Sequence, residues 1–95
     1  MAIVKLIDFK EYQRIEHDHE DELVEQLLLA AETAAKNWCR TKFEEDAEEP
    51  VKLAVMMHAG FQYEHRSTPD EKAYQAMMRA FRDLLTPYSD PDLEF

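Results

Sequence analysis

The sequence is poor in the residues that form turns. It contains one glycine, and its four prolines lie outside the stretches with a clear helical period. Because tight turns depend on these two residue types, their scarcity disfavours short strands and favours long helices. One glycine is also too few for a glycine-rich phosphate-binding loop. Cys39 is the single cysteine, which excludes a disulfide framework or a multi-cysteine zinc site within one chain and indicates a reducing compartment such as the cytoplasm.

Long apolar runs and basic residues are scarce as well. The apolar stretch 1–7 is too short for a signal sequence, and no segment approaches the roughly 20 apolar residues of a membrane span, so we expect a soluble protein that contacts no membrane. The 21 acidic residues outnumber the 11 Lys and Arg residues, and the net charge is −10. A field of this sign repels phosphate and disfavours sequence-specific DNA binding. Surface ion pairs are therefore the favoured role for four basic residues that would otherwise be candidates for nucleic-acid contacts: Arg40, Lys42, Arg79 and Arg82.

The apolar content is high enough for a folded core. Hydrophobic residues make up 45% of the chain and aromatic residues 11%, which is far more than in a disordered segment. A length of 95 residues allows one domain, residues 1–95, with a modest core. We expect an all-α fold, a small bundle of about four helices followed by an extended C-terminal tail.

Two helices are expected in the first half of the chain. Asp8 is a good N-cap for a short helix over 9–15, with an acidic residue three positions later as in a capping box. A longer helix should open at Asp18 or His19, because the acidic residues that follow favour the positive end of the helix dipole. Apolar residues at helical spacing predict its buried face. That face comprises Leu23, Leu27, Ala31, Ala34 and Trp38, widened by Val24, Leu28 and Ala35.

Two further helices are expected in the second half. Pro50 suits the first position of a helix, since its fixed φ fits the helix and its missing N–H would be unbonded there. This third helix should run to about Arg66 and be the central one, because it has almost no polar face over its first two turns. Gly60 permits close approach of another helix. A fourth, amphipathic helix after 67–70 should end at Pro87 and Pro91, which leaves 89–95 as a tail. Its apolar face comprises Tyr74, Met77, Met78, Phe81, Leu84, Leu85 and Tyr88.

The possible catalytic and metal-binding residues have simpler structural interpretations. The segment 16–19, Glu-His-Asp-His, holds metal-ligand types, but neighbouring helical positions point about 100° apart, so a solvated segment at a helix start is favoured over a metal site. His58 and His65 lack the i, i+4 spacing of a helical metal pair and are predicted at the edge of the core. Cys39 is predicted to be a packing residue. We expect neither enzymatic activity nor a cofactor.

Two acidic segments have interpretations that stay open. The block 44–49, Glu-Glu-Asp-Ala-Glu-Glu, is most simply a solvated loop, although a functional role is not excluded. The tail 90–95 alternates acidic with apolar residues. Such a composition can dock as an extended peptide in a neighbour's groove, or it can fray as a free end.

The order of these features is itself informative. The segment Leu6–Ile15 is followed by acidic residues and Leu23, and then by an alanine-rich helical segment, 27–35. The third helix starts with Pro50–Ala54 and ends with Phe61–Arg66, and Leu84–Tyr88 closes the helical part of the chain. In this order, over nearly the whole chain, the sequence resembles the head-to-tail connector, or adaptor, proteins of long-tailed double-stranded DNA phages. None of the segments is chemically specific, so their joint order carries the resemblance.

The resemblance implies a structural virion protein at the head-to-tail junction, assembled in the host cytoplasm. Such a protein forms a ring of about a dozen subunits. The ring docks on the portal protein after DNA packaging, meets a head-closure or tail-completion protein, and extends the DNA channel without sequence-specific binding. Channel-facing acids would repel phosphate over about 8 Å at physiological salt. The candidate channel-facing acids are Glu44, Glu45, Asp46, Glu48 and Glu49, and the candidate partner-docking residues of the tail are Tyr88, Leu93 and Phe95.

A second hypothesis follows from the charge. A small acidic cytoplasmic protein can act as a regulatory or antitoxin-like binding module whose surface mimics nucleic acid or covers a basic partner. Mass measurement separates the two hypotheses. A large ring favours the adaptor, and a tight one-to-one complex with a basic protein favours the module.

Overall fold

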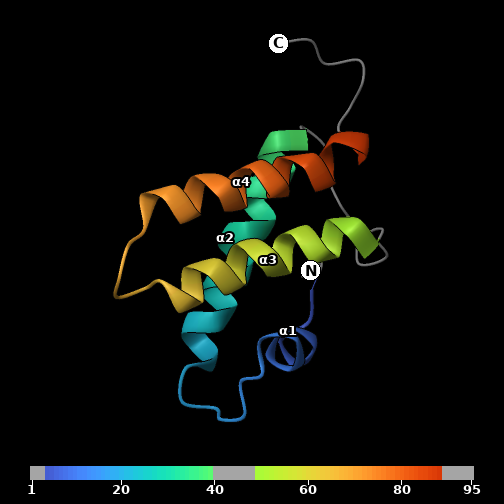
Figure 1. Cartoon of the computed structure of the whole chain (residues 1–95). Helices are drawn as coiled ribbons and strands as arrows, with labels where there is room; N and C mark the ends of the chain where they lie inside the picture. Colours follow the sequence, from blue (N-terminus) through green and yellow to red (C-terminus); the bar gives the residue numbers. More distant parts are fainter. Residues whose placement is uncertain (1–3, 40–48, 89–95) are drawn as a thin grey trace.

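A computed structural model describes residues 4–39 and 49–88 of the chain (Figure 1). These two ranges contain four α-helices and one short 3-10 helix, and they contain no strand. The elements are α1 Leu6–Gln13, α2 Asp21–Cys39, α3 Glu49–Glu64, α4 Glu71–Leu85 and η1 Thr86–Tyr88. The predicted all-α fold with a short first and a long second helix is confirmed.

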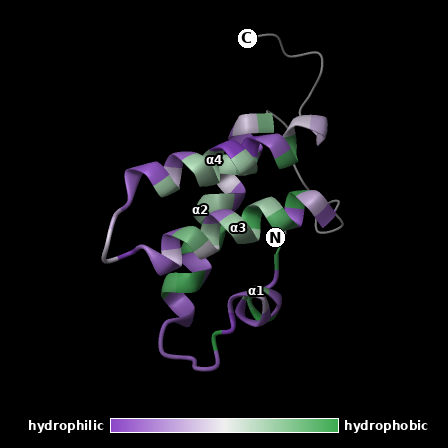
Figure 2. Cartoon of the chain, in the orientation of Figure 1, coloured by the Kyte–Doolittle hydropathy of each residue, from purple (hydrophilic) through white to green (hydrophobic). Residues whose placement is uncertain are grey.

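The helices are arranged around α3. In Figure 1, α3 and α4 run antiparallel and side by side, α2 crosses behind them, and α1 lies near one end of α2. α3 packs against each of the other three helices, which confirms its predicted central place. Figure 2 shows hydrophobic residues gathered most densely on α3, whereas hydrophilic residues mark much of α4 and α1. The largest fully buried side chains come from all four helices: Phe9, Val24, Cys39, Val51, Val55, Phe81 and Leu85.

α1 begins earlier than predicted and ends on an unusual residue. Its N-cap is Lys5, which makes no side-chain capping bond, so the prediction of Asp8 as N-cap is wrong. Asp8 lies in the first turn instead, where a carboxylate still favours the positive end of the helix. The helix ends in a Schellman motif, in which Arg14 adopts the left-handed conformation (φ 59°) and the Ile15 N–H donates to the Lys10 carbonyl at 2.8 Å.

α2 begins at Asp21, two to three residues later than predicted, and its buried face is rotated from the predicted one. The buried residues are Val24, Leu28, Ala31, Glu32, Ala35 and Cys39. Of the residues predicted at the centre of this face, Ala31 is buried, but Leu23, Leu27 and Ala34 are half-buried and Trp38 is 38% exposed. The predicted and the observed buried residues both repeat at helical spacing, so the sequence period defines only a broad apolar face of α2. The position at which α3 crosses α2 determines which part of that face is buried.

α3 and α4 follow the prediction within two residues at their described ends. α3 begins at Glu49, with Pro50 in its first turn, and ends at Glu64 instead of Arg66. α4 is capped by Asp70, whose side chain accepts a hydrogen bond from the Ala73 N–H at 3.1 Å. It ends at Leu85 and continues as η1, and the predicted tail 89–95 lies outside the described residues.

Candidate partner-binding surfaces

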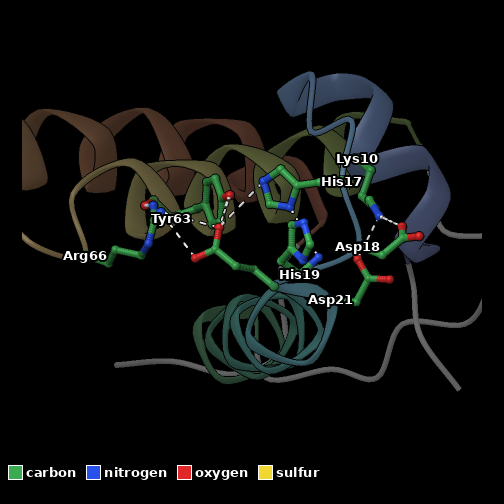
Figure 3. A network of polar contacts seen from close by, with 8 residues as sticks. Lys10, His17, Asp18, His19, Asp21, Tyr63 and Arg66 are labelled. Carbon is green, nitrogen blue, oxygen red and sulfur yellow. Dashed lines mark hydrogen bonds and ion pairs between the residues drawn. The ribbon is translucent and has the colours of Figure 1, made fainter.

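A polar network fixes the segment between α1 and α2 against the end of α3 (Figure 3). At its centre, the Glu20 carboxylate accepts a hydrogen bond from the Tyr63 hydroxyl at 2.6 Å and pairs with the Arg66 guanidinium at 3.3 Å. The bond from Tyr63 and the charge of Arg66 lower the pKa of Glu20 below its usual value. The same bond raises the pKa of the Tyr63 hydroxyl. Arg66 also lies over the Tyr63 ring, 4.2 Å from its centroid.

A second group of charges joins α1 to the start of α2. The Lys10 ammonium lies 2.7 Å from one carboxylate oxygen of Asp18 and 2.7 Å from one of Asp21. These bonds raise the pKa of Lys10, and the bond from Lys10 lowers the pKa of Asp18. Figure 3 shows all three side chains meeting at one point beside α1. The Lys10 group thus ties α1 to the start of α2, and the Glu20 network ties the segment before α2 to the end of α3.

α1 packs closely on α3 at Gly60. A Cβ atom built at Gly60 would come within 2.5 Å of Gln13 Oε1 and 3.7 Å of the Tyr12 ring. The predicted close helix approach at this glycine is therefore confirmed. Gln13 also donates a hydrogen bond to Glu64 at 2.6 Å, across the same contact.

The segment 16–19 is exposed, as predicted, and Asp18 is hydrogen-bonded to Lys10. The rings of His17 and His19 stack at 5.3 Å, and His17 Nε2 lies 3.8 Å from Glu20. Residues 4–39 and 49–88 contain no group of three or more His, Cys, Asp or Glu side chains arranged to hold a metal ion.

Two reactive side chains lie in the core. The thiol of Cys39 is buried, donates to the Leu85 carbonyl at 3.6 Å, and has its pKa raised by burial, so the predicted packing role is confirmed. His58 is 7% exposed, and its ring centroid lies 5.0 Å from that of Phe81. Burial lowers the pKa of His58, and its Nδ1 makes no hydrogen bond. His65 is half-buried and stacks on Phe61 at 4.1 Å.

The surface exposes several large apolar side chains. Leu29 of α2 and Ile7 of α1 are each 64% exposed, and Leu53 of α3 is 41% exposed. A groove of about 450 Å³ lies beside Leu29 and is lined by Val4, Leu6, Glu25, Leu28, Leu29, Glu32 and Lys36. We call it the α2 groove. Exposed apolar side chains beside a hollow are typical of a protein-binding surface.

Glu32 gives the α2 groove an unusual polar centre. Its side chain is 6% exposed, although acidic residues are rarely buried without partners. Lys36 Nζ lies 3.3 Å from Glu32 Oε1, within ion-pair distance, but the two atoms are not aligned for a hydrogen bond and Oε1 accepts none. Sequence reasoning missed this residue. The sequence feature that could have indicated it is its place at the edge of the apolar face of α2, next to Leu28 and Ala31.

The predicted site residues are described only in part. Glu44, Glu45, Asp46 and Glu48 lie outside the described residues, as do Leu93 and Phe95. Glu49 is exposed at the start of α3, 3.9 Å from Lys52 Nζ, and Tyr88 is half-buried at the end of η1.

The four basic residues considered for nucleic-acid contacts are likewise described in part. Arg40 and Lys42 lie outside the described residues, whereas Arg79 and Arg82 are exposed on α4. Arg82 lies over the Trp38 ring, 5.3 Å from its centroid.

Three comparisons with known proteins place this helical chain. Residues 3–89, nearly its whole length, match the family model described as phage gp6-like head-tail connector protein. Searches of curated proteins and of solved structures found no match. No helix in the described part of the chain is long and apolar enough to cross a membrane. The helix order and the family match together make this chain a member of the phage gp6-like head-tail connector family, a structural component of the virion that joins phage head and tail parts.

Proposed function

We propose that this protein is the head-completion adaptor, a single connector domain that docks on the portal protein after DNA packaging and extends the DNA channel toward a head-closure or tail-completion protein. It acts as a ring of about a dozen copies, without catalysis and without a cofactor. The family match over residues 3–89 carries this proposal. The exposed Leu29, Ile7 and Leu53 support it, because a small protein that works alone has little reason to leave such side chains in water.

Native mass spectrometry and negative-stain imaging test the ring. The purified protein, alone or with the portal protein of the same phage, should form closed rings of one subunit number. A protein that stays monomeric under both conditions refutes the proposal. A tight one-to-one complex with a basic protein would instead support the regulatory or antitoxin-like module, which the net charge of −10 keeps as the second candidate.

The acidic residues 44–49 are proposed to face the channel. Their charge would keep DNA phosphates from adhering as the genome passes, over about 8 Å at physiological salt. Replacing Glu44, Glu45, Glu48 and Glu49 by glutamine should slow DNA ejection from assembled phage. A matched variant in which four exposed acids outside both polar networks and the α2 groove are replaced by their amides, Glu11, Glu16, Glu22 and Asp83, controls for the change in net charge. Ejection at the normal rate in the 44–49 variant would leave this segment a solvated loop.

The tail is proposed to dock on the portal or on a neighbouring subunit through Tyr88, Leu93 and Phe95. Deleting residues 90–95 should weaken binding to the portal while leaving the helical content unchanged, because the core lies within α1 to α4. Binding is measured by co-sedimentation and helical content by circular dichroism. Full binding by the truncated protein would overturn the docking role.

A further inference from the structure

The α2 groove contains an incomplete charge pair. Glu32 Oε1 is shielded from water yet accepts no hydrogen bond, and its neighbour Lys36 is a turn away on the same helix with poor alignment. A carboxylate removed from water is stabilised by donors that point directly at its oxygens, and a guanidinium supplies them best. The surrounding Leu28, Leu29 and Val4 would lose their remaining contact with water if a partner covered the groove.

The chain itself offers a matching surface on α4. From Lys72 to Arg82 this helix contains three basic residues and no acidic one, in a protein whose acids outnumber its basic residues almost two to one. Glu71 and Asp83 border this stretch, and Asp83, four residues after Arg79, is exposed on the same face as Arg79. Lys72, Ala76 and Arg79 are exposed and share one face, on the opposite side of α4 from the buried Met77 and Phe81. The described residues give Arg79 no ion pair, whereas Arg82 lies over the Trp38 ring. Within residues 4–39 and 49–88, Arg79 is a guanidinium on this face without an ion pair, and Lys72 is an ammonium without one.

Small side chains make the α4 face accessible to another helix. Ala76 lies one turn before Arg79 on the same face, and its small side chain lets another helix approach closely. The α2 groove and the α4 face are different patches on the same chain, as a head-to-tail contact requires. A contact of this type repeats from copy to copy and closes into a ring when the rotation per step is right.

We propose that the α2 groove receives the α4 face of a neighbouring copy, with Arg79 of that copy completing the pair at Glu32. This inference rests on the proposed ring and specifies its subunit interface. Leu29 is covered by the same contact, which accounts for its exposure in the isolated chain. A mostly desolvated pair of this kind is screened by salt much less than surface charges are.

Charge reversal on each side tests the interface. Arg79→Glu and Glu32→Lys should each weaken association at least about tenfold per contact, so that neither protein forms rings. An equimolar mixture of the two should form rings with an even number of subunits, because each variant then meets its complement on both sides. Sedimentation velocity and native mass spectrometry give the assembly state. Circular dichroism checks folding, and Glu32→Gln replaces Glu32→Lys if the lysine variant does not fold.

Lys52→Glu is the matched control for Arg79→Glu, since it makes the same change in net charge on α3, outside both surfaces. It should assemble like the wild type. Rings formed by Arg79→Glu as readily as by the wild type would overturn the interface and leave the proposed function standing. A wild-type protein that forms no ring, alone or with the portal protein, would overturn both.

Discussion

The buried imidazole of His58 allows a quantitative prediction about stability. His58 lies on α3 against Phe81 of α4, with Nδ1 unpaired, and burial lowers its pKa from the usual 6.5. The unfolded chain therefore takes up a proton near pH 6.5 that the folded protein binds only at lower pH. Because the unfolded state binds more protons in this window, the free energy of unfolding should fall as pH decreases from 6.5 toward the folded pKa. Above 6.5 the contribution is constant.

The size of the effect follows from one proton. His58 contributes a slope of at most about 1.4 kcal/mol per pH unit within the window. His58→Leu removes both the proton and the unpaired Nδ1, whose burial costs about 1–3 kcal/mol, and keeps an apolar side chain of moderate size against Phe81. The variant should be at least as stable as the wild type at neutral pH, and its stability should fall less steeply with acid.

Urea unfolding followed by circular dichroism, at several pH values between about 5 and 8, measures this difference. His19→Gln is the control, since it removes an imidazole that is exposed instead of buried. The same slope in His58→Leu and wild type would refute the reasoning. So would a loss of several kcal/mol at neutral pH, because it would mean that the imidazole makes an essential contact.

Three further outcomes are expected. The free energy of unfolding of Gly60→Ala in urea should be within about 0.5 kcal/mol of the wild-type value or higher, because Gln13 can turn its amide away and alanine gains about 1 kcal/mol in helix propensity. A loss above about 2 kcal/mol would show that the α1 backbone is displaced. Arg14→Gly should stabilise the fold by about 0.5–1 kcal/mol, since glycine avoids the cost of about 1–2 kcal/mol for the left-handed conformation and loses less than this in backbone entropy on folding. An unchanged urea midpoint would contradict this. Ring assembly should strengthen between about 0.05 and 1 M salt, because screening reduces the repulsion between copies of charge −10; sedimentation showing rings only at low salt would count against it.

Local rules predicted much of the fold. Pro50 and the acids at the start of α2 mark helix starts within a few residues, because dipole and backbone constraints act within one turn of the chain. The α4 stripe was also predicted correctly at Met77, Phe81 and Leu85, since that helix has one clear apolar face. The N-cap of α1 was predicted wrongly, because a helix can begin without a side-chain cap when tertiary packing, here of Phe9, stabilises it.

The candidate partner-binding surface was decided by the tertiary structure. The sequence determined that α2 has a broad apolar arc, but only the crossing of α3 decided that Val24 and Leu28 would be buried and Leu29 exposed. The bond between Tyr63 and Glu20 joins residues 43 apart, and no local pattern predicts such a contact. Glu32 is an ordinary helical acid in the sequence. It becomes a candidate binding residue because Val4, Leu6 and α2 form a groove around it, and burial of a charge depends on what packs nearby, not on the residue itself.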